Sequence, residues 1–374
     1  MIKANPYSNK PIITIVVGTR PEAIKLAPVY LTLKASNKII TRLVLTGQHK
    51  DLVTQVLDIF QIDCDKNFNL MREKQSLEFL TKQIIEELSK EFEEYLPSLL
   101  LVQGDTTTAF VSALCAFYKR IPIGHVEAGL RTNNIYSPYP EEANRRLISQ
   151  ISTIHFAPTV NAKNNLILNG INSNIHVTGN TVIDALLTSL KFKNKPSKFK
   201  KENEKLILVT IHRRENQGLK LKQIAFALIK IVYKFNDVRL LIPLHPNPDI
   251  RGELKKYLKD IPRISLVEPL EYVDLISEMN SSYLLLTDSG GLQEEAPTLG
   301  KPVLVLREST EREEVIKSGG AILVGSDSDL IIEKVSELIY DKSKYAQMAN
   351  TPNPYGDGHS SKKILKIIEE FLEI

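Results

Sequence analysis

The sequence predicts an α/β protein made of two doubly wound, Rossmann-like domains. Short runs of apolar, often β-branched residues alternate with longer amphipathic segments along the 374 residues of the chain. The alternation is interrupted once, by residues 191–205 (KFKNKPSKFKKENEK), which carry seven lysines and two glutamates. Strands that each lead into a helix predict parallel sheets covered on both faces, and the polar interruption separates two such series.

In the first series, residues 12–17 (IITIVV) are a continuous apolar run and predict a buried strand. A helix is expected from Pro21 towards residue 35, because proline suits the first helical position. Residues 76–95 carry apolar side chains at a spacing near 3.6 and predict another helix. By the same criteria we expect strands at 39–46, 98–103 and 121–126, and helices at 49–60 and 106–118.

In the second series, apolar runs predict strands at 206–211, 239–244, 264–267, 283–287 and 302–306. Amphipathic segments predict helices at 219–235, 271–279 and 291–299. We therefore expect an N-terminal domain over residues 1–185, a C-terminal domain over 186–358, and a final helix over 359–374 that packs back on the N-terminal domain. Ligands of such sheets bind beyond the carboxyl ends of the strands, here in a cleft that the two domains face.

The composition excludes several other classes of protein. Hydrophobic residues make up 43% and charged residues 25% of the chain, which is typical of a globular protein with sizeable cores. No apolar run approaches the ~18 residues of a membrane-spanning helix, and the first residues, MIKANPYSNKP, lack the apolar core of a signal peptide. We therefore expect a cytoplasmic protein with no membrane partner.

Cysteine and charge counts narrow the class further. Cys64 and Cys115 are the only cysteines, too few for a disulfide framework and typical of a reducing compartment. The net charge of +4 and the lack of tryptophan argue against a nucleic-acid partner. The lysine-rich residues 191–205 are interpreted as a solvated linker, with a lipid- or RNA-binding patch as the alternative.

The loop after the first strand is a candidate anion site. Gly18 allows a tight turn before the helix, and the free N–H groups of a helix start attract an anion. Arg20 and Lys25 add two cations at the same place. The alternative interpretation is a capped helix start with a surface arginine. The loop lacks the G-x-G-x-x-G pattern, so nothing in it predicts a bound dinucleotide.

A second candidate anion site follows the strand at 283–287. Gly290 and Gly291 let the backbone approach a ligand, and the hydroxyl of Ser289 can donate to a phosphate. Glu294 and Glu295 lie about one turn into the next helix, where they can accept hydrogen bonds from sugar hydroxyls. A plain strand-to-helix turn with a serine cap is the alternative.

Three carboxylates of the first domain form a candidate general acid/base set. Asp105 and Glu127 each follow a predicted strand, and Glu141 begins a helix. Each has an ordinary explanation as well, since Asp105 can cap the next helix and Glu141 favours the helix dipole. Three acids on three loops at one edge of a sheet are nevertheless suited to proton transfer.

Two of the seven histidines end strands of the second domain. His212 precedes Arg213 and Arg214, a combination suited to binding a phosphate and stabilising a leaving group. His245 ends the next strand. No H-x-x-x-H or paired-cysteine pattern accompanies them, so we expect no metal site.

Together these motifs resemble the non-hydrolysing UDP-N-acetylglucosamine 2-epimerases of bacteria. The resemblance extends from Val16 to Gly358. It is carried by VVGTRPEAIKLAPV, TGQHKDL, GDTTTAF, GHVEAGLRT, YSPYPEEANRR, VTGNTVIDAL, HRREN, LTDSGGLQEEAPTLGKPVLVLRESTERE and NPYGDG.

The resemblance implies a fold of the glycosyltransferase-B type, a homodimer, no nicotinamide cofactor and no obligatory metal. It implies that UDP leaves C1 of the sugar while the C2 proton is removed, and that UDP adds back to 2-acetamidoglucal after reprotonation on the other face. Asp105, Glu127 and Glu141 match the carboxylates that move protons, and the sequence does not say which is acid and which is base. The matching UDP-binding positions are Arg20, Lys25, His212, Ser289, Gly290, Gly291, Glu295 and Arg312, and His212 is also counted as catalytic.

A second UDP-N-acetylglucosamine activates bacterial members of the family. The matching candidate positions here are Gln48, His49, Lys74, Arg213 and His245. Lys74 stands where many members have arginine, which affects the strength of activation. Two alternative functions stay open: a hydrolysing 2-epimerase that releases N-acetylmannosamine and UDP, and a glycosyltransferase-B-type protein that only binds or transfers a sugar nucleotide.

Overall fold

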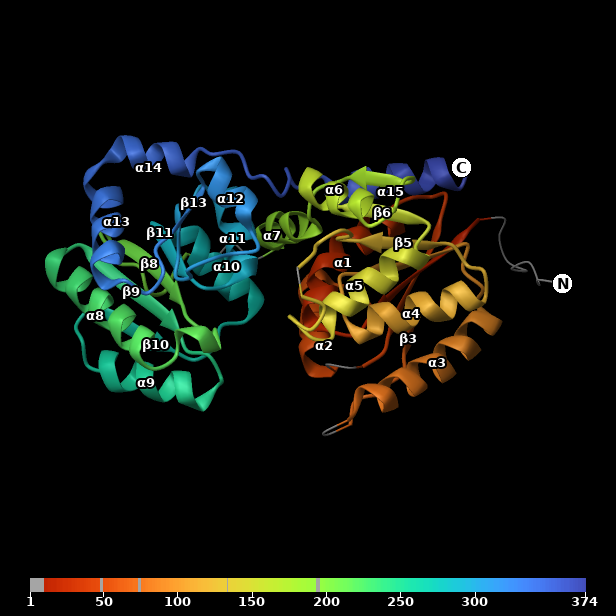
Figure 1. Ribbon diagram of the computed structural model, residues 1–374, viewed down its shortest axis with the longest axis horizontal. Helices are drawn as coiled ribbons and strands as arrows, with labels where there is room; N and C mark the ends of the chain where they lie inside the picture. The colour runs from red at the N-terminus through yellow and green to blue at the C-terminus, as the bar shows by residue number, and fades with distance from the viewer. Residues whose placement is uncertain (1–9, 48–49, 73–74, 133, 193–195) are drawn as a thin grey trace. The chain divides into compact units, whose positions relative to one another are not determined.

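The computed structural model describes residues 10–47, 50–72, 75–132, 134–192 and 196–374 (Figure 1). The chain forms two compact units, and each contains one parallel sheet with helices on both faces. Unit 1 comprises Met1–Thr188 and Tyr355–Ile374, and unit 2 comprises Ser189–Pro354. The predicted fold class, two doubly wound parallel sheets, is confirmed.

The sheet of unit 1 has seven strands in the order β3-β2-β1-β4-β5-β6-β7, and every neighbouring pair is parallel. The chain starts in the middle of the sheet, at a strand whose six residues are all buried. It winds outward to β3 and then returns to β4, so the winding direction changes between β1 and β4. The strands are β1 (Ile12–Val17), β2 (Ile40–Leu45), β3 (Lys66–Asn67), β4 (Leu99–Gln103), β5 (Ile123–Val126), β6 (Ile154–Ala157) and β7 (Ile175–Val177).

Two groups of helices cover this sheet. Helices α3, α4 and α5 pack against one another, and α1 packs against α2 and α15 (Figure 1). Their bounds are α1 (Arg20–Lys34), α2 (Lys50–Phe60), α3 (Leu77–Glu94), α4 (Thr107–Tyr118), α5 (Glu141–Ile151), α6 (Val160–Leu168), α7 (Thr181–Phe192) and α15 (Ser360–Phe371).

The last helix of the chain is attached to unit 1 at its first turn. The buried carboxylate of Asp184, on α7, accepts hydrogen bonds from the backbone N–H groups of Ser360 and Ser361 at 3.2 and 2.8 Å. These two N–H groups have no partner within α15 because they belong to its first turn. Asp184 therefore fixes the start of α15 to α7.

The sheet of unit 2 has six parallel strands in the order β10-β9-β8-β11-β12-β13, and its winding direction changes between β8 and β11. The strands are β8 (Lys205–Thr210), β9 (Val238–Pro243), β10 (Ile264–Val267), β11 (Leu284–Thr287), β12 (Val303–Val305) and β13 (Ala321–Leu323). The helices are η1 (Arg214–Asn216), α8 (Leu219–Lys234), α9 (Pro248–Leu258), α10 (Tyr272–Ser281), α11 (Gly290–Glu295), η2 (Ala296–Leu299), α12 (Glu313–Ser318), α13 (Ser328–Tyr340) and α14 (Lys342–Ala349).

One predicted helix differs in the structure. The segment 291–299 is α-helical only to Glu295 and continues as a short 3₁₀ helix over Ala296–Leu299. Pro297 has no N–H group to donate to the carbonyl four residues earlier, which explains why the α-helix ends there. In the part of the chain that the structure describes, no helix is long and apolar enough to cross a membrane.

Candidate active site

The loops that follow the central strands carry most of the predicted site residues, in each unit at the edge where the winding direction changes. In unit 1 these loops follow β1, β4 and β5, and in unit 2 they follow β8, β11 and β12. This edge is where doubly wound sheets bind ligands, because loops on either side of the change diverge and leave a crevice.

Glu127 lies directly after β5, with its side chain buried among hydrogen-bond donors. Lys25 Nζ donates to Oε1, Gln103 Nε2 donates to Oε2, and Asn180 Nδ2 donates to Oε1 at 3.0 Å. The backbone of Glu127 has φ +63°, a conformation that costs a non-glycine residue about 1–3 kcal/mol. Such strain persists only where the surroundings fix it, and it is concentrated at functional sites.

Asp105 follows β4 and forms an ion pair with Arg145 at 2.5 Å. Burial raises the pKa of Asp105, the Arg145 guanidinium opposes this shift, and the charge of Glu127 adds to it. Asp105 does not cap α4, because Thr106 is the N-cap residue and its hydroxyl accepts from the N–H of Ala109 at 2.9 Å. The alternative explanation of Asp105 as a helix cap is therefore wrong.

Glu141 is the first residue of α5 and is partly buried. Its Oε2 atom is buried and has no hydrogen-bond partner among the described residues. The next residue, Glu142, is fully buried and forms ion pairs with Arg145 and Arg146 at 3.0 and 2.8 Å. Glu142 is thus committed to the fold, whereas one oxygen of Glu141 has no donor among the described residues.

Glu22 is a buried acid that the sequence analysis did not include among the site residues. Its carboxylate accepts from the N–H groups of Gly18 and Thr19 at 3.1 and 2.7 Å, and from the Thr19 hydroxyl at 2.8 Å. It also accepts from the hydroxyl of Thr106 at 2.6 Å. Burial raises the pKa of Glu22 to about 7 although these hydrogen bonds oppose the shift. Glu22 therefore joins the loop after β1 to the loop after β4, next to Asp105.

The glycine at the start of the first loop is required by packing. A Cβ atom on Gly18 would lie 2.2 Å from the hydroxyl of Thr108 and 2.7 Å from that of Thr46, closer than atoms can approach. Arg20, two residues later, is exposed at the start of α1, while Lys25 is largely buried beside Glu127. The structure thus brings Lys25, Asp105 and Glu127 together and leaves Arg20 at the surface of unit 1.

In unit 2, His212 is held by a buried aspartate that the sequence analysis did not single out. His212 Nδ1 lies 2.7 Å from Asp288 Oδ1, and Asp288 also accepts from the N–H groups of His212 and Arg213. Burial alone would raise the pKa of Asp288, but the hydrogen bonds from His212 and Arg213 lower it below the ordinary value. An ionised carboxylate only accepts, so Nδ1 of His212 carries hydrogen and Nε2 is available to a ligand.

The predicted anion loop of unit 2 packs beside Arg312. A Cβ atom on Gly290 would lie 3.7 Å from Arg312 Nη2, so the guanidinium is next to the loop backbone. Arg312 forms an ion pair with the buried Glu294 at 2.5 Å, and Glu295 accepts from the Tyr272 hydroxyl at 2.9 Å. Ser289 is the N-cap residue of α11, but its side chain makes no capping hydrogen bond.

Two of the five candidate activator residues can be placed. The imidazole rings of His212 and His245 are stacked with their centroids 5.9 Å apart, and Arg213 forms an ion pair with Glu311 at 3.3 Å. Both residues therefore lie beside the candidate UDP-binding residues of unit 2. Gln48, His49 and Lys74 lie outside the described residues.

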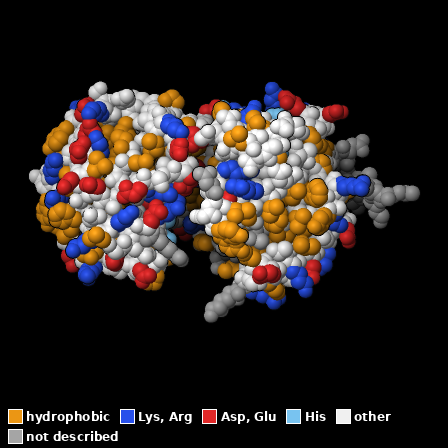
Figure 2. Space-filling view, in the orientation of Figure 1, with side chains coloured by type: hydrophobic (Ala, Val, Ile, Leu, Met, Phe, Trp, Pro, Cys, Tyr) orange, Lys and Arg blue, Asp and Glu red, His pale blue; other side chains and the backbone are white. Residues whose placement is uncertain are grey.

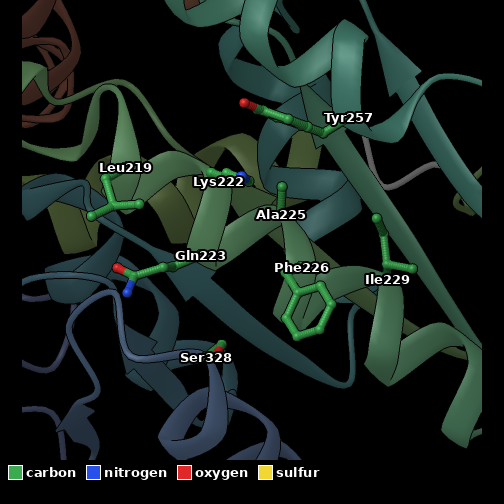
Figure 3. A pocket seen from close by; sticks show the side chains of 8 residues that line it. All are labelled: Leu219, Lys222, Gln223, Ala225, Phe226, Ile229, Tyr257 and Ser328. Carbon is green, nitrogen blue, oxygen red and sulfur yellow. The ribbon is translucent and has the colours of Figure 1, made fainter.

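An apolar hollow of unit 2 lies elsewhere. It has a volume of about 300 Å³ and is lined by residues of α8 and α9 and by Ser328, among them Leu219, Phe226 and Tyr257 (Figure 3). None of the predicted site residues lines it. Within the described ranges, no group of three or more His, Cys, Asp or Glu side chains is arranged to hold a metal ion.

Comparison with known proteins adds an independent finding. The model of the UDP-N-acetylglucosamine 2-epimerase family matches residues 31–369. The UDP-N-acetylglucosamine 2-epimerase of Neisseria meningitidis serogroup A is 48% identical over 364 residues, which cover 94% of this chain and 98% of that protein. The corresponding enzyme of Escherichia coli K12 is 42% identical over 365 residues, which cover 95% and 97%.

Solved structures agree with these sequence matches. The N. meningitidis UDP-GlcNAc 2-epimerase bound to UDP-GlcNAc superposes with a TM-score of 0.87 at 46% identity, covering 96% of this chain and 100% of that chain. A glycosyltransferase of kitacinnamycin superposes with a TM-score of 0.67 at 12% identity, covering 97% and 99%. That second likeness concerns the fold alone and fits the predicted glycosyltransferase-B type.

Proposed function

This chain belongs to the UDP-N-acetylglucosamine 2-epimerase family, and on that premise we propose that it interconverts UDP-N-acetylglucosamine and UDP-N-acetylmannosamine without hydrolysing them. The observation that carries the proposal is the partly buried cluster of Lys25 on α1, Asp105 after β4 and Glu127 after β5. Two carboxylates close enough to influence each other can differ in protonation, which is what moving a proton on and off one carbon requires.

The chemistry explains why carboxylates and cations are both needed. C2 of the sugar is not adjacent to a carbonyl group, so its proton is too weakly acidic for simple enolisation. Breaking the C1–O bond to UDP together with the C2–H bond forms the C1=C2 double bond of 2-acetamidoglucal. Reprotonation at C2 from the opposite face and re-addition of UDP at C1 then give the epimer. The proton passes to and from protein carboxylates, and the electron pair of the broken C1–O bond leaves with UDP.

The geometry distinguishes the three candidate carboxylates. Glu127 accepts three hydrogen bonds, which favour its charged form. Burial raises the pKa of Asp105, which makes this carboxyl easier to protonate than an exposed aspartate, and Glu141 has an oxygen without a partner among the described residues. We therefore assign Glu127 as the charged member of the set, Asp105 as a proton donor, and Glu141 as the carboxylate that contacts the substrate directly.

Unit 2 supplies most of the residues proposed to bind UDP. His212 offers Nε2 because Asp288 holds Nδ1, and Arg312 lies next to Gly290. An imidazole and a guanidinium stabilise the negative charge of a departing pyrophosphate. The structure of a relative bound to UDP-GlcNAc supports a nucleotide sugar as the ligand. The other proposed UDP-binding residues are Arg20, Lys25, Ser289, Gly291 and Glu295.

We further propose a cytoplasmic homodimer that takes part in cell-surface polysaccharide biosynthesis. Hydrophobic side chains gather on the face of unit 1 that carries α3, α4 and α5 (Figure 2). Phe117 and Tyr118 at the end of α4 and Leu147 on α5 are 51%, 71% and 49% exposed. An apolar face of this kind is suited to bury itself against a second copy of the chain. Light scattering of the purified protein measures the mass directly.

Activation by a second substrate molecule remains a proposal of the same kind. His245 and Arg213 lie beside His212, where a second nucleotide sugar would contact the first. Gln48, His49 and Lys74 complete the proposed activator site by their match to the family pattern.

Proton NMR of UDP-N-acetylglucosamine with the purified protein in D₂O tests the main proposal. The expected result is the appearance of UDP-N-acetylmannosamine together with deuterium at C2. Free N-acetylmannosamine and UDP as the accumulating products would instead indicate a hydrolysing enzyme. A spectrum that stays unchanged would leave only a protein that binds or transfers sugar nucleotides, and would contradict the proposal.

A further inference from the structure

We infer that Asn180 and Gln103 are positioning residues for the proposed reaction, holding the carboxylate of Glu127 in one orientation and in its charged form. This inference rests on the proposed function for its consequence in catalysis, but its physical basis lies in unit 1 alone. Both residues carry a neutral amide, both are buried, and each donates one hydrogen bond to a different oxygen of Glu127.

The orientation of the Asn180 amide follows from its second hydrogen bond. Its Oδ1 accepts from the N–H of Val182 at 3.1 Å, and only a carbonyl oxygen can accept there. The other end of the amide, which faces Glu127 at 3.0 Å, is therefore the donor Nδ2. The backbone of Asn180 is fixed as well, since its N–H donates to the carbonyl of Tyr355 at 2.6 Å. These two hydrogen bonds hold Asn180 in place independently of Glu127.

Glu127 needs such partners for two reasons. Its backbone adopts a strained positive φ, and its side chain is 6% exposed, so water contributes little to holding it charged. Lys25 supplies an opposite charge in direct contact, through Oε1. Two other titratable groups that interact with it are Asp105, from the loop after β4, and His125 on β5.

Those two neighbours do not replace the amides. Asp105 is acidic and its charge disfavours that of Glu127, and burial lowers the pKa of His125 to about 3, so His125 is neutral at physiological pH. Hydrogen bonds from Gln103 and Asn180 stabilise the charged carboxylate, and the amide groups that donate them do not titrate. Removing either bond should make Glu127 easier to protonate, because the charged form loses more than the neutral form does.

The test compares Asn180→Ala and Asn180→Asp with the control Asn165→Ala. Asn165 also donates from a partly buried amide in unit 1, at 3.0 Å, but to the carbonyl of Gly129 instead of a carboxylate. Turnover is measured from pH 5.5 to 8.5. We expect the acidic limb of the profile to move up by about one pH unit in Asn180→Ala, the size expected for one hydrogen bond to a charged group. Asn180→Asp keeps the acceptor for Val182, adds a negative charge, and should move the limb further.

A second measurement does not depend on activity. In protein labelled at the side-chain carboxyl carbon of glutamate, the ¹³C signal that is absent from Glu127→Gln reports the protonation of Glu127 directly. Its midpoint should rise in Asn180→Ala and in Gln103→Glu and stay at the wild-type value in Asn165→Ala. An unchanged midpoint in the first two variants would overturn the inference. Wild-type protein that titrates as expected but does not epimerise would overturn the proposed function and leave this inference supported.

Discussion

The buried carboxyl of Glu22 should make the stability of the protein depend on pH in a direction opposite to that of an ion-paired acid. In the folded protein Glu22 is fully buried and burial raises its pKa to about 7, against the ordinary value of 4.5. Between these two pH values the folded state keeps a proton that the unfolded chain releases. The stabilisation is therefore complete below about pH 4.5 and is lost as the pH rises through about 7.

The magnitude follows from the same two values. A carboxyl with these pKa values stabilises the folded state by about 2.5 kcal/mol more at pH 5 than at pH 8. In Glu22→Gln this dependence disappears, because an amide does not titrate. The amide also places a donor against the donors of Gly18, Thr19 or Thr106, which costs stability at every pH. The prediction therefore concerns how much the stability difference between wild type and Glu22→Gln changes from pH 5 to pH 8.

Thermal unfolding at pH 5 and pH 8 measures that change. For a unit of this size, about 2.5 kcal/mol corresponds to a change of about 5–10 °C in the difference between the two melting temperatures. Glu370→Gln on α15 is the matched control, since it removes an exposed glutamate from the same unit and should leave the difference constant. If the melting temperatures of wild type and Glu22→Gln differ by the same amount at pH 5 and at pH 8, the reasoning is refuted.

Three further predictions concern the proposed site. The candidate carboxylates are each replaced by the matching amide in Asp105→Asn, Glu127→Gln and Glu141→Gln. Each variant should turn over ~10²–10⁴ times more slowly, while its affinity for UDP, measured by calorimetric titration, stays nearly unchanged. Near-normal turnover in all three variants would contradict their role. His212→Ala and Arg312→Ala should each weaken UDP binding by about 1.5–3 kcal/mol, the value of a charged hydrogen bond, and unchanged UDP affinity in both would remove them from the pyrophosphate. Lys74→Arg should lower the concentration of UDP-N-acetylglucosamine that half-activates the reverse reaction, because arginine contacts a phosphate through two N–H groups, and equal half-activation concentrations would remove Lys74 from the activator site.

Two strands of the sequence prediction agree with the structure in both bounds. Residues 12–17 were predicted as a buried strand and form β1 with the same bounds, and 264–267 likewise form β10. No strand was predicted at β6 or β7. These strands have only four and three residues, and His155 and His176 interrupt their apolar runs, so periodicity gives no signal. Strand β6 pairs with β5 and β7 pairs with β6, so the rest of the sheet decides their place.

The candidate site residues were likewise predicted only in part from the sequence. Motif spacing identified residues at strand ends, such as Asp105 and His212, because parallel strands bring their carboxyl ends to one edge. It did not identify Glu22, Asp288, Gln103 or Asn180, which lie in the same motifs or the strands before them. Their importance comes from burial and from partners 24 to 84 residues away in the chain. A single sequence carries no direct signal for such pairs.

The two units use the same edge of the same kind of sheet for opposite electrostatic tasks. In unit 1 the acids are the buried groups, and Lys25 and Arg145 are the cations that control their charge. In unit 2 the groups available to a ligand are cationic or neutral donors, and the buried acids Asp288 and Glu294 orient them. A carboxylate already paired with each donor reduces the net charge that an anion meets, so binding gains less from charge and depends more on geometry. This would suit the proposed reaction, in which UDP leaves C1 and then returns, because a site that binds the leaving group too tightly would stop the reaction halfway.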